Sequence, residues 1–342
     1  MNREMRETLN HAQAYEQMLR EANELYSKGG KEAENALKGP VLKKWKQIVH
    51  AQKWLAQNYT KNHEAARLCS SYPFVGELLV YLWLKPKTRL QWGEAAAAAA
   101  RRIKDRDAEA AHRHKLGMAY IDLGQFKEAI PHLKRGVVLN RMIGRPAYEG
   151  SDFGGLGLAY AGLKDHGKAI RYYEKALAIF RRTGNEDARW GEGIYLSNLA
   201  ESWRALGDPR KAITLHEQAL EINREVKDVN SEGYALGNLG KAYADLGEHE
   251  RALQLFKENK VIAEKYKVPQ SRGYAIFEAS RVMWKMGQRS EAIEAAEQAL
   301  AIFESIQDFY RFRTRQQLKK WRKQEGKQPA GDKAQNNLAA SA

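Results

Sequence analysis

Apolar residues recur at helical spacing along most of the chain, and between residues 108 and 307 one pattern returns about every 40 residues. An apolar stretch such as Leu239, Ala242, Tyr243 and Leu246 leads into a short turn, and a second helical stretch follows. The turn is marked by one residue after a leucine in each copy, with intervals of 40, 43, 40 and 40 residues: Gly124, Lys164, Gly207, Gly247 and Gly287. The pattern therefore predicts five copies of a helix, a tight turn and a second helix.

Small residues occupy fixed places in both predicted helices, which indicates that the two helices approach each other closely. In the first helix they are Gly117, Gly157, Ala200, Gly240 and Ser280. In the second helix they are Ala129, Ala169, Ala212, Ala252 and Ala292. Larger side chains are expected to fill the space beside them: Tyr120, Tyr160, Trp203, Tyr243 and Met283.

The turn glycine suits a helix C-terminus, where the backbone adopts a left-handed conformation that most side chains oppose. Lys164 departs from this pattern, and we expect the nearby Gly167 to take over the role. The three extra residues between Lys164 and Gly207 are expected to enlarge the loop 181–193, where Trp190 is either an exposed contact or a cap on a seam.

The flanking segments repeat poorly. Residues 1–107 predict an N-terminal helical region continuous with the repeats, with helices at 12–30, 40–59, 64–84 and 86–103. A basic capping helix is predicted for residues 308–325. The tail 326–342 is small, polar and aperiodic, which predicts disorder.

The order Leu239, Gly240, Tyr243 and Ala252, repeated in the other copies, resembles the tetratricopeptide repeat. The 40-residue period is similar to the extended repeats of kinesin light chains and spindle-orientation adaptors. This resemblance implies an all-α fold, a right-handed superhelical solenoid of antiparallel helix hairpins with a concave groove. Physical reasoning agrees, since one hairpin cannot bury its apolar face and stacked neighbours supply a continuous core.

Residues 23–120 also resemble the helical region that precedes tetratricopeptide arrays in bacterial STAND-type signalling NTPases. The stretches that carry this likeness are "NELYSKGG", "LKKWKQIVHAQKWLAQN" and "LKPKTRLQWGEAAAAAARRIKDRDAEAAHRHKLGMAY". It implies a role in bacterial signalling or defence, either as a standalone regulator or as a sensor half separate from its motor.

Composition and motifs indicate neither catalysis nor a membrane protein. The sequence holds no G-x-x-x-x-G-K-[ST] and no H-E-x-x-H, and His112 and His114 are two apart, where metal-binding pairs on a helix prefer four. We therefore expect no cofactor, no metal and no enzymatic activity. The single cysteine, Cys69, excludes an intrachain disulfide and fits a reducing compartment. No apolar run approaches the roughly 18 residues of a membrane span, and residues 1–19 lack the apolar core of a signal peptide. A cytoplasmic protein is the expectation.

In the families that the repeats resemble, asparagines before the Leu-Gly pair bond the backbone of an extended peptide. Asn198 and Asn238 hold this place, whereas Lys115, Gly155 and Glu278 stand in the other copies. A carboxamide both donates and accepts, as a peptide backbone does. Further candidates lie one or two turns away: Tyr234, Tyr274, Glu201, Lys241, Arg281, Arg204, Asp122, Asp245 and Lys285. The alternative is that the asparagines bond neighbouring helix ends and that the tyrosines only pack.

The net charge of +15 is concentrated toward the C-terminus. The basic residues there are Arg311, Arg313, Arg315, Lys319, Lys320, Arg322 and Lys323. One reading is a cap whose Phe309, Phe312, Gln316 and Trp321 cover the last repeat. The other is a patch for nucleic acid or an acidic partner, with Trp321 available to stack.

The predicted function is a non-catalytic protein-interaction module that holds a protein or peptide partner in the groove. The alternatives are a nucleic-acid-associated regulator that uses the basic C-terminus and an in-trans regulator of a protease or NTPase. The pattern assigns no oligomeric state.

Overall fold

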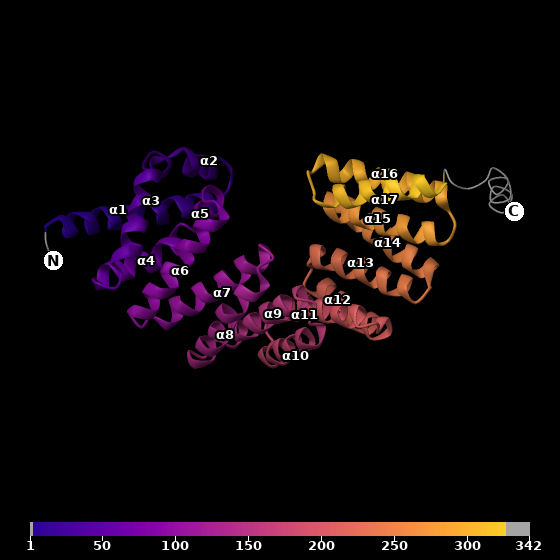
Figure 1. Ribbon diagram of the computed structural model, residues 1–342, viewed down its shortest axis with the longest axis horizontal. Helices are drawn as coiled ribbons and strands as arrows, with labels where there is room; N and C mark the ends of the chain where they lie inside the picture. Colours follow the sequence, from indigo (N-terminus) through magenta and orange to yellow (C-terminus); the bar gives the residue numbers. More distant parts are fainter. Residues whose placement is uncertain (1–2, 326–342) are drawn as a thin grey trace. The chain divides into compact units, whose positions relative to one another are not determined.

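A computed structural model describes residues 3–325, and that part of the chain folds into seventeen helices without a strand, which confirms the all-α prediction. The chain divides into two units, Met1–Ile179 and Phe180–Ala342, and the division falls within helix α10 (His166–Thr183). Both units consist of helices packed against one another (Figure 1). The predicted disorder of residues 326–342 lies outside the described residues.

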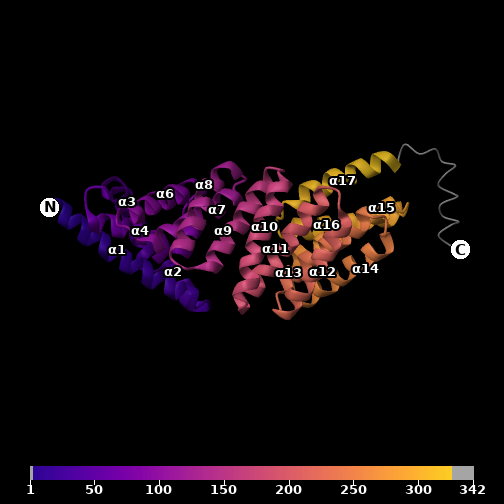
Figure 2. The ribbon, with the colours of Figure 1, turned by 90° about the horizontal axis from the view of Figure 1, so that it is seen from below.

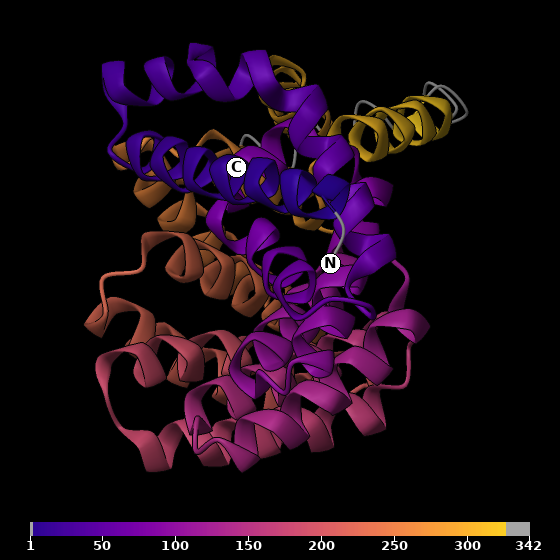
Figure 3. The same cartoon turned by 90° about the vertical axis from the view of Figure 1, so that its left-hand side faces the viewer.

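The N-terminal unit begins with six helices that belong to no repeat copy. They are α1 (Arg3–Ser27), α2 (Gly30–Lys38), α3 (Pro40–Asn58), α4 (His63–Val75), α5 (Glu77–Trp83) and α6 (Pro86–Arg102). Helices α1, α2 and α3 contact one another at the outer end of this unit, in front in Figure 3. The predictions for α3 and α6 are confirmed, whereas α2 was not predicted.

One predicted helix of this unit is wrong, because residues 64–84 form two helices that separate at Gly76. A Cβ atom at this position would lie 2.9 Å from Leu19 Cδ2, closer than side chains tolerate. Glycine therefore lets the α4–α5 junction press against α1, and the apolar spacing of the sequence does not reveal this constraint.

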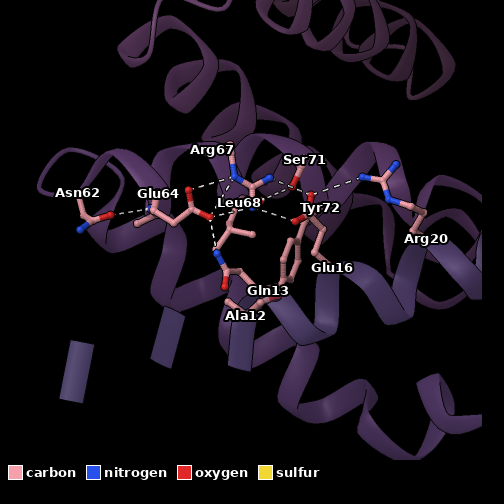
Figure 4. Close-up of polar contacts among 11 residues, drawn as sticks. Ala12, Gln13, Glu16, Arg20, Asn62, Glu64, Arg67, Leu68, Ser71 and Tyr72 are labelled. Carbon is pink, nitrogen blue, oxygen red and sulfur yellow. Dashed lines mark hydrogen bonds and ion pairs between the residues drawn. The ribbon is translucent and has the colours of Figure 1, made fainter. Parts of the chain in front are cut away.

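A polar network joins α1 to α4 (Figure 4). Arg67 donates to Glu16 Oε2 at 3.0 Å and to Glu64 Oε1 at 2.8 Å. Gln13 donates to Glu64 Oε1 at 2.8 Å, and the Tyr72 hydroxyl donates to the Ala12 carbonyl at 2.8 Å. Hydrogen bonds from Arg67, which outweigh the effect of burial, lower the pKa of Glu64. The network thus holds together two helices that are about 50 residues apart in sequence.

The repeat helices pair in chain order, as predicted. In the N-terminal unit they are α7 (Arg106–Asp122), α8 (Phe126–Met142) and α9 (Pro146–Gly162). In the C-terminal unit they are α11 (Glu186–Ala205), α12 (Pro209–Glu225), α13 (Val229–Asp245), α14 (His249–Lys265), α15 (Pro269–Lys285) and α16 (Arg289–Ser305). Each helix from α11 to α16 contacts the next, so that the hairpins form a stack (Figure 2).

The three extra residues of the 43-residue interval do not enlarge a loop, contrary to the prediction. Helices α10 and α11 have 18 and 20 residues, whereas α12 to α16 have 17 each. Only Gly184 and Asn185 lie between α10 and α11 as connection. The half-exposed Trp190 lies within α11, and its indole N–H donates to Asp228 Oδ2 at 2.7 Å.

Every predicted turn residue adopts a left-handed conformation, with φ from 62° at Lys164 to 88° at Gly207. The amide after each turn residue bonds the carbonyl five positions earlier, for example Asp208 N to Trp203 O at 3.0 Å. This closure defines the Schellman motif of a helix C-terminus. Gly167 lies inside α10 with an ordinary φ, so the expectation that it replaces Lys164 is wrong. Lysine itself adopts the strained conformation there.

The predicted close approach between helices is confirmed by burial. The alanines at 129, 169, 212, 252 and 292 are fully inaccessible. Gly240 faces Phe256, whose ring would stand 2.7 Å from an added Cβ atom. Small residues on one helix therefore make room for a large ring on the other.

The first helices of successive hairpins also contact one another, α11 with α13 and α13 with α15. Among the described residues, the second helices α12, α14 and α16 show no comparable contact with each other. The first helices therefore line the inner face of the C-terminal unit, and the candidate binding residues lie on them.

Helix α17 (Tyr310–Glu325) covers α16, and of the four predicted contact residues only Trp321 takes part. Thr314, Leu318 and Trp321 are buried, and Trp321 stacks on Trp284 with ring centroids 4.7 Å apart. Phe309 and Phe312 are exposed instead, as is Gln316. The burial of Trp321 also contradicts the expectation that it is available to stack on a base.

Candidate functional site

Six of the predicted partner-binding residues line one cavity on the inner face of the C-terminal unit. The cavity measures about 250 Å³, and the six residues are Arg204, Lys241, Asp245, Tyr274, Arg281 and Lys285. Helices α11, α13 and α15 supply them. The remaining walls come from Ala244, Phe256, Glu278, Val282, Tyr310 and Arg313.

Ion pairs fix most of the charges around this cavity. Glu201 accepts from Arg204 at 3.0 Å, and its other oxygen lies 3.4 Å from Lys241 Nζ. Arg204 also bonds Asp245 Oδ2 at 2.7 Å, so that it links α11 to α13. Burial acts to raise the pKa of Glu201, but the nearby His216 and the charges of Lys241 and Arg204 outweigh it and hold the pKa well below its usual range. Glu201 is therefore a carboxylate that orders two cations.

Glu278 occupies the place of the asparagine in the fifth repeat copy and is almost fully buried. It accepts from Arg281 at 2.8 Å, one turn along α15. This ion pair, rather than a carboxamide, fills the position next to Asn238 on the inner face. The predicted ladder accordingly consists of two asparagines only.

The two asparagines lie on adjacent helices but in different surroundings. Asn198 lines a second cavity of about 210 Å³ with Tyr234, which is half exposed. Asn238 is 1% exposed; its side chain interacts with the Tyr234 hydroxyl, but its Nδ2 makes no hydrogen bond of regular geometry within the described part of the chain. An unpaired buried donor is costly, because burial removes its bonds to water. A ligand with an acceptor group at this place would relieve that cost.

Lys115 lies in the N-terminal unit and is not brought together with the other candidates. Its Nζ pairs with Glu77 at 2.6 Å and sits 4.6 Å from the centre of the Phe74 ring. It lines a largely apolar cavity of about 510 Å³ among α5, α6 and α7. Asp122 lines the same cavity.

The seven basic residues predicted as a patch on α17 have different surroundings. Arg315 pairs with Glu304 at 2.7 Å and Arg322 with Glu297 at 2.5 Å. Arg311 lies over Phe312, and Arg313 points to the inner cavity. The others are exposed: Lys319, Lys320 and Lys323.

Within residues 3–325, no group of three His, Cys, Asp or Glu side chains could hold a metal ion, and no helix is long and apolar enough to cross a membrane. Burial raises the pKa of the Cys69 thiol to about 12. It also lowers the pKa of His112 to about 3. Both side chains are packed in the N-terminal unit.

Two residues of α17, Tyr310 and Arg313, line the cavity but were not predicted as part of the groove. Tyr310 and Arg313 are three residues apart and therefore share a face of α17. The sequence shows this spacing, but the contact of that face with α15 depends on how α17 docks.

Comparison with known proteins identifies repeats in both units. A family model described as tetratricopeptide repeat matches residues 153–225, 192–259 and 231–305, and a second model with the same description matches residues 113–141. Together these matches cover just over half of the chain. No curated protein sequence matches the chain.

Solved structures include both classes that the sequence resembles. The tetratricopeptide-like repeats of a kinesin-light-chain-like protein from Podosopora anserina are 25% identical, with a TM-score of 0.47, covering 57% of this chain and 95% of that one. A STAND protein with a tetratricopeptide repeat sensor from Pyrococcus horikoshii is 20% identical, with a TM-score of 0.54, covering 78% of this chain and 41% of that one. A Rap protein complexed with Competence and Sporulation Factor is 10% identical, with a TM-score of 0.54, covering 94% of this chain and all of that one.

Proposed function

Because this chain belongs to the tetratricopeptide repeat family, we propose that it is a non-catalytic interaction protein that holds a partner polypeptide on the inner face of its C-terminal unit. The proposal rests on the composition of this inner face. It combines a buried carboxamide whose Nδ2 makes no regular hydrogen bond, a half-exposed tyrosine and ordered charges on three successive first helices. Such a mixture suits a peptide, which offers backbone bonding groups and side chains of both polarities.

A regulatory role in the cytoplasm, in signalling or defence, is the second part of the proposal. Repeats of this fold serve as the sensor in the Pyrococcus horikoshii protein, and the Rap protein was crystallised with a factor bound. The alternative of nucleic-acid binding through α17 has less support, because Trp321 is buried and two of the seven basic side chains are paired with glutamates.

The double variant Asn198→Ala/Asn238→Ala is expected to weaken the partner about tenfold. Each bond to a peptide backbone contributes roughly 0.5–1.5 kcal/mol, and 1.4 kcal/mol is a factor of ten. The tagged chain is used to capture its partner from nuclease-treated native lysate, and the affinity of the captured protein is then measured for each variant.

The matched control is Asn10→Ala/Asn35→Ala, which removes two exposed carboxamides from the N-terminal unit. It should bind as the unchanged chain does. Full affinity in the Asn198/Asn238 variant, with its helical circular dichroism intact, would contradict the proposal. Recovery of nucleic acid alone when nuclease is omitted would favour the α17 alternative.

A further inference from the structure

We propose that α17 completes an anion-binding pocket on the inner face and that the partner places one acidic group, a carboxylate or a phosphoryl group, in it. The inference rests on the proposed function, since it states which chemistry the bound polypeptide carries. The pocket is the 250 Å³ cavity between α13, α15 and α17, called here the anion pocket.

The anion pocket has an excess of positive charge. Five cationic side chains line it, against the two acidic side chains Asp245 and Glu278. Each of these acids is already paired, Asp245 with Arg204 and Glu278 with Arg281. Lys241 is in contact with Glu201.

Two cations remain without an acidic partner among the residues that the structure describes, Lys285 of α15 and Arg313 of α17. They reach one cavity from different helices. Arg313 is exposed, and its guanidinium carbon lies 5.8 Å from the centre of the Tyr310 ring and 6.0 Å from that of Phe277. Its planar guanidinium group can donate two parallel hydrogen bonds to a carboxylate or phosphate.

Tyrosines supply the neutral part of the pocket. The rings of Tyr274 and Tyr310 meet edge to face with centroids 5.6 Å apart. Burial, followed by the charge of Glu278, raises the pKa of Tyr274, so its hydroxyl stays protonated and can donate to an anion. Lys285, Arg313 and the Tyr274 hydroxyl can each donate to an oxygen of one acidic group.

The size of the pocket is consistent with this ligand. A volume of about 250 Å³ exceeds that of a carboxylate or phosphate with several waters, since one water occupies about 30 Å³. Glu278 and Asp245 at the walls would repel a long run of acids. One acidic group, flanked by residues of other kinds, is therefore the expected occupant.

Direct binding to the full chain tests the proposal. Three fluorescent capped peptides of equal length are compared by anisotropy, with a single central glutamate, phosphoserine or glutamine in a glycine and serine background. We expect the glutamate or the phosphoserine peptide to bind at least tenfold more tightly than the glutamine peptide. The stronger of the two identifies the source of the anion.

The pocket variant is Lys285→Gln/Arg313→Gln, and the matched control is Arg210→Gln/Lys257→Gln, which removes the same two charges from exposed positions on α12 and α14. The pocket variant should lose the preference for the acidic peptide at least tenfold, and the control should keep it within twofold. Equal losses in both variants, equal binding of the glutamine peptide, or no binding of any peptide would overturn the anion pocket. The proposed function would still stand if the captured partner continued to depend on Asn198 and Asn238.

Discussion

Replacing Trp321 by alanine is expected to undock α17 and to lower the stability of the C-terminal unit by about 3–5 kcal/mol, the range for deleting a large buried aromatic side chain. Trp321 is 3% exposed and stacks nearly parallel on Trp284, with an angle of 8° between the rings. Its loss would also uncover Ala292 and Ala296, which pack in the same cluster. For a unit of this size the melting temperature should fall on the order of 10 °C, as measured by circular dichroism.

The control is Phe309→Ala on the same segment. Phe309 is 79% exposed, so its removal should change the stability by no more than about 0.5 kcal/mol. A large loss of stability from Phe309→Ala, together with a small one from Trp321→Ala, would mean that α17 docks through Phe309 and not through Trp321.

Replacing Asp152 by alanine is expected to destabilise the N-terminal unit by about 3 kcal/mol, because it leaves buried bonding groups without partners. The fully buried carboxylate joins three helices: it accepts from Asn140 Nδ2 of α8 at 2.7 Å and lies 2.8 Å from His114 Nδ1 of α7. Thermal unfolding followed by circular dichroism measures the loss.

The conservative variant Asp152→Asn should cost less, because its amide still offers an oxygen to Asn140 and a donor to His114. Burial raises the pKa of Asp152 above 3.8, its ordinary value. The folded state therefore binds the proton more tightly, and the stability due to Asp152 falls as the pH rises from 3.8 through the folded pKa. The cost of Asp152→Asn should accordingly shrink over that range. A cost that grows with pH, or an alanine variant as stable as the original, would contradict this account.

Repetition made the hairpins predictable from the sequence. Five copies that agree at the turn and at the buried alanines, Ala129 through Ala292, leave little freedom in how the two helices of a hairpin meet. The prediction that Gly167 replaces Lys164 at the turn is wrong, because the hydrogen bonds of a Schellman motif can hold a lysine in the left-handed conformation.

The structure differs from the sequence-based prediction elsewhere at places that depend on contacts between segments far apart in the chain. The junction of α4 and α5 at Gly76 lies against Leu19 of α1, and the spacing of residues 64–84 does not encode that contact. Both faces of α17 carry aromatic residues, and only its docking on Trp284 selects Trp321 over Phe309. The same docking brings Arg313 to the cavity that Lys285 lines, so the anion pocket is a tertiary feature that local sequence patterns do not predict.

The central claim is that the partner lies on the inner face of the C-terminal unit, and site-specific photo-crosslinking tests it most directly. Benzoylphenylalanine replaces Tyr234 in one variant and Tyr266 in another, two tyrosines that are 50% and 51% exposed. Tyr234 lines the cavity of about 210 Å³ with Asn198, whereas Tyr266 lies at the turn after α14. After irradiation in nuclease-treated native lysate, we expect one dominant protein adduct from position 234 and none from position 266. Adducts of equal yield from both positions, or an adduct from position 266 alone, would contradict the claim.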